Sequence, residues 1–279
     1  MVNPTNSNAE GAIWRVSTWR GWAAVIFCSF TIVEASSAFY RVFTGLSPWD
    51  DEGYFMISVK QFLDGHPLYT EVFSPYGPFY YLYEWVAFHI TRTAVSHDSF
   101  RFLTLFAWLL IPLISAWSVY RITRSIPLSV IAQLAVFQLF SALSWEPGHP
   151  TELTEILVAA GMLLVVYAEK GSGRRWALPC LGAVAAAMTL TKINVGGLFV
   201  IAVGLAFLTY MLRSRLTQAI WRASLVVAVI VPVVLTHRLF SQAWARNFAI
   251  IVALSVVAAM LFIYKKTRRI AIIVFFVEF

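Results

Sequence analysis

Three carboxylates stand side by side early in the chain, at Asp50, Asp51 and Glu52, directly after an apolar segment. Adjacent carboxylates repel one another, so one of them could serve as a general base near neutral pH. The same oxygens could instead attract a divalent cation such as Mg²⁺ or Mn²⁺. A structural alternative is that Asp50 or Asp51 caps a helix over residues 53–63. The spacing alone leaves these interpretations open.

A second pair of acidic residues lies at the start of a later apolar segment. Glu152 and Glu155 are spaced i, i+3, which places them on one face of a helix. Carboxylates at the mouth of a membrane helix are costly unless hydrated or partnered, which favours a polar cavity there. They could equally complement the positive end of the helix dipole. A cation held by Asp51 and Glu152 is a further alternative, although His66 and His149 lack metal-ligand spacing.

Basic and aromatic residues accompany these acids. Lys192 is the only basic residue of the turn at 191–197, where it either snorkels or pairs with a phosphate. A run of aromatic residues at 79–90 is typical of a membrane interface, but it could also stack against a sugar or line a lipid groove. That run contains Tyr80, Tyr81, Tyr83 and Trp85.

The elements that position these residues are membrane helices. Of the 279 residues, 59% are hydrophobic and 13% are charged, against about 45–50% and about 25% in soluble domains. Mean hydropathy is +0.73, so the chain is predicted to be a polytopic membrane protein with little extramembrane mass. Cys28 and Cys180 both lie in apolar segments, which indicates neither a disulfide framework nor a cysteine metal site.

The predicted fold is all-α, with about eight transmembrane helices and a partial ninth from residue 270. Closed barrels are excluded because the segments are apolar on every face. We do not expect the first segment to be a cleaved signal peptide, because it is long and further spans follow. The expected spans are residues 21–43, 101–120, 127–144, 154–168, 176–191, 193–212, 223–240 and 248–264.

Two further helices are predicted within the first outer loop, at about 44–100. Residues 53–63 form an amphipathic helix whose apolar face, with Phe55 and Val59, suits a membrane surface. Residues 79–90 are too few to cross a bilayer and suit an interfacial or re-entrant helix.

The distribution of charge sets the predicted orientation. With residues 79–90 not spanning, 14 of the 21 Lys and Arg residues fall on one side, and ten of the 14 acids fall on the other. By the positive-inside rule, segment 1–20 is cytoplasmic and the acidic loops face outward, in the cell (inner or plasma) membrane. The net charge of +7 is therefore a topology signal and predicts no nucleic-acid partner. Glu34, inside the first span, is expected to be buried against a neighbouring helix.

The order of these motifs resembles the GT-C superfamily of integral membrane glycosyltransferases. The matching features are Asp51-Glu52 after the first span, Gly65-x-Pro67-Leu68-Tyr69, Gly77-Pro78-x-x-Tyr81 and an embedded helix, over roughly residues 20–212. The nearest branch contains protein O-mannosyltransferases, aminoarabinose transferases of lipid A and uronic acid transferases acting on lipopolysaccharide. The resemblance implies transfer of a sugar from a polyprenyl-phosphate donor to a glycan, lipid or protein acceptor outside the cytoplasm.

The resemblance also implies roles for individual residues. Asp51 would deprotonate the acceptor hydroxyl, with Asp50 and Glu52 as its catalytic neighbours, and Glu152 matches the acid of the second outer loop. Lys192, with Asn194 and Gly196 in a Lys-x-Asn-x-Gly turn, would suit the lipid phosphate. The remaining expected contacts are Arg92 and Arg101 to the donor phosphate, and Tyr76, Tyr81, His149 and Asn194 to sugar or lipid. No cofactor is certain, and a divalent cation is optional.

Two rival classes remain. A transporter or lipid flippase would have an internal repeat and ionisable residues at mid-membrane; we find no such repeat in the sequence. A non-catalytic membrane subunit would use the acids only as caps, and then Asp51, Glu152 and Lys192 would have no reason to converge. The segment 265–279 reads as a basic turn and an incomplete last helix, after the transmembrane module at 21–264. We therefore expect a truncated or inactive fragment as a further alternative.

Overall fold

The structure is a computed structural model, which describes residues 7–45, 51–143, 146–169, 174–210, 219, 223, 226–227, 229–230, 233–234 and 236–264. The side chains of 7–20, 142–143, 169, 174, 205–210, 244 and 256–264 are not described. Asp50 lies outside the described residues. So do the basic turn and last helix expected at 265–279, and much of the expected span at 223–240.

The described residues are helical, which confirms the all-α prediction. They form nine α-helices and one short 3-10 helix, and their only β-type pairing is an isolated bridge between Leu68 and Val72. The chain divides into two compact units, Met1–Ile193 and Asn194–Phe279.

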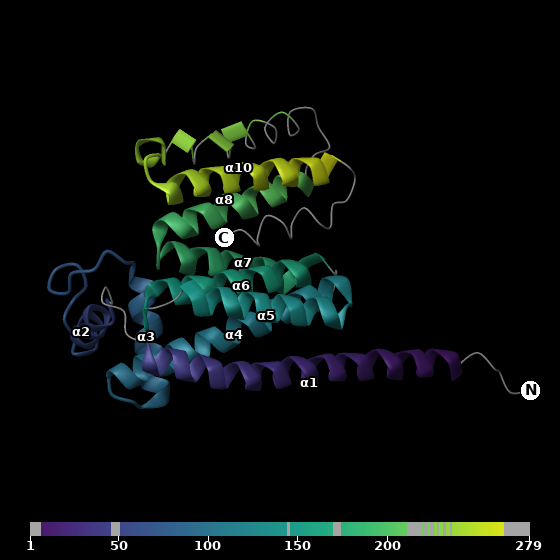
Figure 1. Cartoon of the computed structure of the whole chain (residues 1–279), viewed down its shortest axis with the longest axis horizontal. Helices are drawn as coiled ribbons and strands as arrows, with labels where there is room; N and C mark the ends of the chain where they lie inside the picture. The colour runs from purple at the N-terminus through teal and green to yellow at the C-terminus, as the bar shows by residue number, and fades with distance from the viewer. Residues whose placement is uncertain are drawn as a thin grey trace, which may run out of the picture. The chain divides into compact units, whose positions relative to one another are not determined.

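The first unit, drawn in Figure 1, contains seven of the described helices. They are α1 (Ser7–Thr44), α2 (Glu52–Leu63), α3 (Pro78–Thr91), α4 (His97–Thr123), α5 (Ile126–Leu143), α6 (Pro150–Glu169) and α7 (Arg174–Thr189). The long helices α1 and α4–α7 run alongside one another, and α2 and α3 lie across one end of them. In the second unit, α8 (Ile193–Tyr210) is followed by the 3-10 helix η1 (His237–Leu239) and by α10 (Ala243–Tyr264).

Local sequence explains where the helices of the first unit begin. Pro78 occupies the first turn of α3, where its missing N–H costs nothing. Ser96 caps α4, since its hydroxyl accepts from the Ser99 N–H and its own N–H donates to the Ser99 hydroxyl. Pro150 opens α6 in the same way as Pro78 opens α3. The helices α3, α4 and α6 therefore have well-defined starts.

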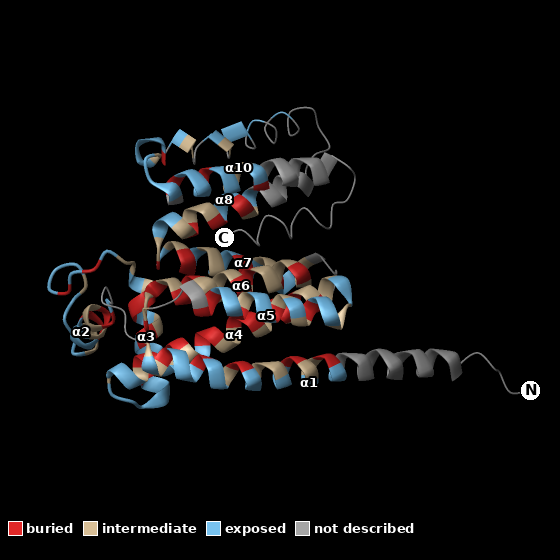
Figure 2. Ribbon diagram, in the orientation of Figure 1, coloured by how far each residue is buried: buried red, intermediate tan, exposed pale blue. Residues whose placement is uncertain are grey.

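Three helical segments among the described residues are long and apolar enough to cross a membrane: Gly21–Thr44, His97–Thr123 and Pro150–Ala168. Shorter apolar stretches occur at Ile126–Ser141, Ile193–Gly204 and Ala245–Ser255. All six coincide with predicted spans, while the count of eight stays a prediction. Large apolar side chains are exposed on the long helices, as at Ile32, Val33 and Phe106, and the outward side of α1 is exposed along its described length (Figure 2). Such faces suit a lipid solvent.

The long helices pack through apolar contacts and through buried polar groups. Trp108 and Ile111 of α4 lie in a core shared by α1, α5 and α6. Between α1 and α5, the Gln133 amide nitrogen donates to the carboxylate of Glu34 at 3.0 Å and to the Thr31 hydroxyl at 3.0 Å. Glu34 is therefore buried against a neighbouring helix, as predicted, and its partner is Gln133.

One prediction about α2 was wrong. Its apolar residues Phe55 and Val59 do not face outward onto a membrane surface; they are buried in a core that includes Tyr80, Phe100 and Leu153. An apolar helix face is satisfied by protein as well as by lipid, and here α3, α4 and α6 cover it. Burying this face fixes α2 across the ends of the long helices.

Candidate functional site

The end of the first unit that carries α2 and α3 brings together most of the described site residues. Glu52, at the start of α2, is buried and forms a two-pronged ion pair with Arg101 of α4, at 3.0 and 3.2 Å. Nδ1 of His97 lies 2.9 Å from the same carboxylate, and Arg101 also donates to the Phe43 carbonyl at the end of α1, at 3.1 Å. Burial alone would raise the pKa of Glu52, but the hydrogen bonds and charges of Arg101 and His97 lower it below its usual value.

Glu52 and Arg101 therefore have a clear structural task. A bidentate guanidinium–carboxylate pair is among the stronger polar contacts in proteins, and here it ties α2 to α4 and to the end of α1. Arg101 is predicted to bind donor phosphate and Glu52 to assist catalysis, but both side chains are engaged with each other. Their predicted roles would require this pair to open.

Asp51 immediately precedes α2 and is exposed. It is the N-cap residue, yet its side chain makes no capping hydrogen bond, so the capping interpretation does not hold for Asp51. Within the described residues its carboxylate makes no other hydrogen bond or ion pair. Its charge acts on Tyr76: burial raises the pKa of the Tyr76 phenol, and the charges of Glu146 and Asp51 raise it further.

A group of five partly buried residues, which we call the polar cluster, lies beside Asp51. It consists of Tyr76, Glu146, His149, Thr151 and Lys192. The Tyr76 hydroxyl lies 3.1 Å from Nε2 of His149, and a Glu146 oxygen lies 3.6 Å from the same nitrogen. The Lys192 ammonium donates to the Thr151 hydroxyl at 2.9 Å and sits over the Tyr76 ring, 5.6 Å from its centroid.

Lys192 is a cation without an ion-pair partner among the described residues. Burial lowers the pKa of its ammonium, while the charges of Glu155 and Glu146 act in the opposite direction. One of its three N–H groups is used by Thr151, so two remain for another acceptor. An ammonium with two remaining N–H donors is what the phosphate interpretation of Lys192 needs. Snorkelling alone would not hold the ammonium over a tyrosine ring.

The turn that carries Lys192 is held against the start of α3 by backbone contacts. The Gly77 and Phe79 N–H groups donate to the carbonyls of Thr191 (2.9 Å) and Leu190 (3.0 Å). A Cβ at Gly77 would lie 2.0 Å from the Leu190 carbonyl oxygen, so only glycine allows this approach. Tyr76 and Lys192, which are far apart in the sequence, are thereby brought together.

Buried carboxyl groups lie behind the cluster. The Glu152 carboxylate accepts from the Thr104 hydroxyl at 2.8 Å, and the same hydroxyl accepts from the Gly148 N–H at 2.9 Å. Glu84 of α3 is buried, and burial raises its pKa to about 8. Glu152 thus positions the 146–149 turn, while Asp51 is exposed. No group of three or more His, Cys, Asp or Glu residues suited to a metal occurs in the described part of the chain, and a cation held by Asp51 and Glu152 stays a prediction.

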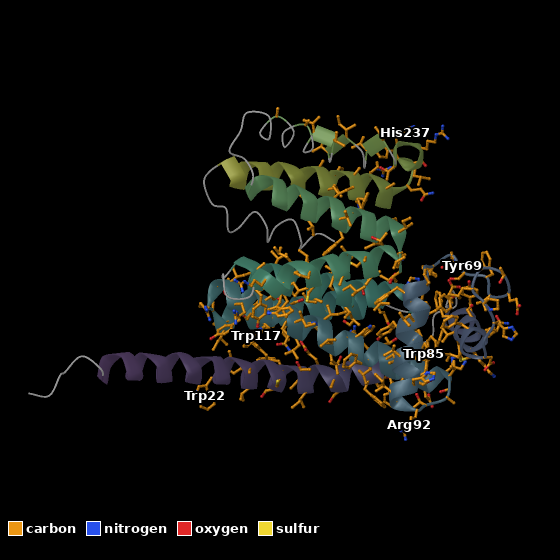
Figure 3. The ribbon with its side chains drawn as sticks, turned by 180° about the vertical axis from the view of Figure 1, so that it is seen from behind. Trp22, Tyr69, Trp85, Arg92, Trp117 and His237 are labelled. Carbon is orange, nitrogen blue, oxygen red and sulfur yellow. The ribbon has the colours of Figure 1, made fainter. Side chains whose placement is uncertain are left out.

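Of the predicted contact residues, Arg92 lies away from the cluster, Tyr81 is enclosed and Asn194 belongs to the second unit. Arg92 follows the last residue of α3, about 20 Å along the helix from Gly77, and it points outward, away from Tyr69 (Figure 3). Tyr81 is fully buried against Phe62 and Tyr80. Asn194 begins the second unit, where its side chain accepts from the Val195 N–H at 3.0 Å.

Sequence reasoning missed three residues of this end region. Glu84 was placed only in an outer helix, Glu146 only in an outer loop, and Thr151 was given no role. For Glu146 and Thr151 the one local signal was their position near the turn residues Pro147, Gly148 and Pro150, and Glu84 had no such signal. No protein-family model matches the sequence, and no curated protein or solved structure matches the chain.

Proposed function

We propose that this chain is an integral membrane glycosyltransferase of the GT-C type. It moves a sugar from a polyprenyl-phosphate-linked donor to a hydroxyl of an envelope glycan, lipid or protein. In this proposal the chain crosses the cell membrane about eight times, its N-terminus is cytoplasmic, and α2, α3 and the polar cluster lie on the extracytoplasmic side. The distribution of basic residues supports that orientation.

One observation carries the proposal: Asp51, Tyr76 and Lys192 meet at one end of the unit. The Asp51 carboxylate is exposed and does not cap α2, its charge acts on Tyr76, and Tyr76 contacts the Lys192 ammonium. Helix caps that were merely structural would have no reason to converge. A free carboxylate beside a cation with spare N–H groups suits a reaction in which a proton is removed and a phosphate departs.

The proposed step is a direct displacement at the anomeric carbon. The acceptor oxygen forms the new glycosidic bond while the bond between the anomeric carbon and the phosphate oxygen breaks. The acceptor proton passes to Asp51, and the electron pair leaves with the polyprenyl phosphate, whose charge Lys192 stabilises. A single displacement inverts the configuration at the anomeric carbon. The lipid tail stays in the bilayer throughout, which is why the cluster must lie near the membrane surface.

The other predicted residues support this step from a distance. Glu52, paired with Arg101, holds the start of α2 and so the backbone of Asp51. Glu152 holds the turn that carries His149. In this arrangement Lys192 is the primary phosphate ligand.

The first prediction tests Asp51 directly. Membranes containing equal amounts of the chain or of its Asp50→Asn, Asp51→Asn and Asp64→Asn variants are incubated with a panel of radiolabelled polyprenyl-phosphate sugars. We expect Asp51→Asn to lower transfer at least about 100-fold, because general-base catalysis contributes typically ~10²–10⁴-fold. Asp64→Asn is the matched control, since Asp64 is exposed at the other end of α2.

Loss of transfer in Asp50→Asn alone would move the base by one position. Equal transfer by Asp51→Asn and the parent chain would remove Asp51 from the mechanism. No transfer from any donor, by a chain that melts cooperatively, would argue against the enzyme and favour a transporter or a non-catalytic membrane protein.

A further inference from the structure

The imidazole of His149 has one ring nitrogen whose role is fixed by the backbone. The Thr151 N–H donates to Nδ1 of His149 at 3.1 Å, and a backbone N–H can only donate, so Nδ1 carries a lone pair. Burial lowers the pKa of His149 to about 4, helped by the charge of Lys192, so the ring is neutral at pH 7. The ring proton therefore resides on Nε2.

This tautomer decides the direction of the next hydrogen bond. Nε2 of His149 lies 3.1 Å from the Tyr76 hydroxyl, and a protonated Nε2 must be the donor. The Tyr76 oxygen accepts, so its own O–H proton points elsewhere. Among the described residues we find no acceptor for that proton, since the Glu146 carboxylate contacts His149 and no hydrogen bond joins it to Tyr76.

Two sets of unused donors therefore lie on the same patch. Tyr76 offers its O–H, and the Lys192 ammonium over its ring offers two N–H groups. The charged groups facing this patch are Lys192 and the carboxylates of Asp51, Glu146 and Glu155. Among the described residues no hydrogen bond or ion pair joins these carboxylates to the Tyr76 hydroxyl or to the Lys192 ammonium, so the unused donors are available to a ligand that brings its own oxygen lone pairs.

We infer that His149 is a positioning residue that turns the Tyr76 hydroxyl into a hydrogen-bond donor, which binds a phosphate oxygen together with Lys192. The inference rests on the proposed function for its ligand, a lipid-linked phosphate, and it adds Tyr76 and His149 to the recognition of that group. The relay runs from the Thr151 N–H through the imidazole to the phenol, and then to the ligand.

Two substitutions at His149 separate this role from a structural one. His149→Asn places a polar atom near the former Nδ1, which keeps a partner for Thr151 but removes the donor to Tyr76. His149→Gln reaches the former Nε2 position and can keep that donor. A residue that merely fills space would respond alike to both, whereas a positioning residue is rescued by Gln only.

The experiment measures binding of a short-chain polyprenyl phosphate to the purified full chain in nanodiscs, by tryptophan fluorescence, with the matching polyprenol as a phosphate-free control ligand. We expect Tyr76→Phe and His149→Asn each to weaken phosphate binding about tenfold, as loss of one hydrogen bond to a charged group does. The double variant should bind no more weakly than either single variant. His149→Gln and the control His66→Asn, in an exposed position, should stay within about threefold of the parent chain.

Inorganic phosphate distinguishes the two sources of the ligand. If inorganic phosphate competes with the lipid for the parent chain but not for Tyr76→Phe, the site binds the free anion. If inorganic phosphate does not compete and the variants still differ as expected, the ligand is the lipid headgroup. Unchanged binding in His149→Asn, additive effects in the double variant, or no binding by the parent chain would overturn the inference. The expected binding pattern without sugar transfer would reject the glycosyltransferase and leave the phosphate site standing.

Discussion

At the end of the first unit that carries α2 and α3, burial decides the charge state of a side chain as much as its chemical type does. Glu52 and Glu84 are both buried glutamates of the same loop region. Glu52 lies beside Arg101 and His97, and its pKa is lowered. Glu84 has no such cation beside it among the described residues, and burial raises its pKa to about 8. One is therefore held as a charged anchor and the other as a neutral acid at pH 7.

This difference predicts a pH dependence for Glu84. An unfolded chain releases the Glu84 proton near pH 4.5, whereas the folded chain keeps it up to about pH 8. Stability contributed by this group is thus present at low pH and is lost as the pH rises between these values. We expect Glu84→Gln to melt close to the parent chain at pH 4.5 and roughly 2–8 °C above it at pH 8, as measured by tryptophan fluorescence of the detergent-solubilised chain.

Asp64→Asn serves as the control for that series, because Asp64 is exposed and its melting curve should follow the parent at each pH. A constant offset between Glu84→Gln and the parent chain across the whole pH range would contradict the prediction.

The roles of these residues were only partly open to prediction. Asp51, His149 and Lys192 were recognised because polar residues beside apolar segments stand out. The pairs that the site residues form could not be predicted, because 49 positions separate Glu52 from Arg101 and 73 separate Tyr76 from His149. Nothing in the local sequence specifies which distant group will pair with a side chain, so the Glu52–Arg101 ion pair could not be predicted, and the phosphate role of Arg101 stays a prediction.

At the scale of elements, the site depends on a short backbone junction between the start of α3 and the end of α7. Helix positions followed well from the sequence: residues 53–63 and 79–90 correspond to α2 and α3 within one residue at each end. The contacts of these two helices could not be predicted. An apolar helix face must be covered, but the sequence does not specify whether lipid or protein covers it. The junction requires glycine at position 77, because a Cβ there would meet the Leu190 backbone, and this contact cannot be seen in the sequence.

Two glycine substitutions test the junction. Gly77→Ala would place a methyl group 2.0 Å from the Leu190 carbonyl oxygen, whereas the Cβ of Gly53→Ala meets nothing within 4 Å. We expect Gly77→Ala to cost at least about 2 kcal/mol and to lower sugar transfer by moving Lys192. Gly53→Ala, in the first turn of α2, should be neutral or stabilise by up to ~1 kcal/mol.

Thermal unfolding and transfer assays on both variants check the pair. If Gly77→Ala melts and works like the parent chain, α3 and α7 separate readily and the junction does not hold the cluster.

At the scale of the whole molecule, the first unit has two chemically different ends. The end with α2 and α3 carries most of the acids, and Trp117 marks the opposite side of the bundle in Figure 3, where Arg121 lies over the Tyr167 ring, 4.4 Å from its centroid. The helix α4 joins the two ends and, with 27 residues, is about 40 Å long. That length exceeds the ~30 Å hydrocarbon core of a bilayer.

The proposed orientation follows from these ends and can be measured. In a chain with Cys28 and Cys180 replaced by serine, single cysteines are introduced as Asp64→Cys and Arg124→Cys, both at exposed positions. In intact cells we expect a membrane-impermeant maleimide to label position 64 and to label position 124 only after the membrane is opened. Labelling of both from the same side would contradict a span formed by α4.

The backbone junction between Gly77 and Thr191 also has a consequence for biogenesis. Tyr76 is synthesised early, whereas Lys192 leaves the ribosome more than a hundred residues later, just as the first unit ends at Ile193. Until α7 has been inserted, the N–H of Gly77 has no carbonyl to meet, and the His149 imidazole has no ammonium nearby. Lys192 is therefore the last member of the cluster to be synthesised, and it joins a group whose other four members, Tyr76, Glu146, His149 and Thr151, precede α7 in the chain.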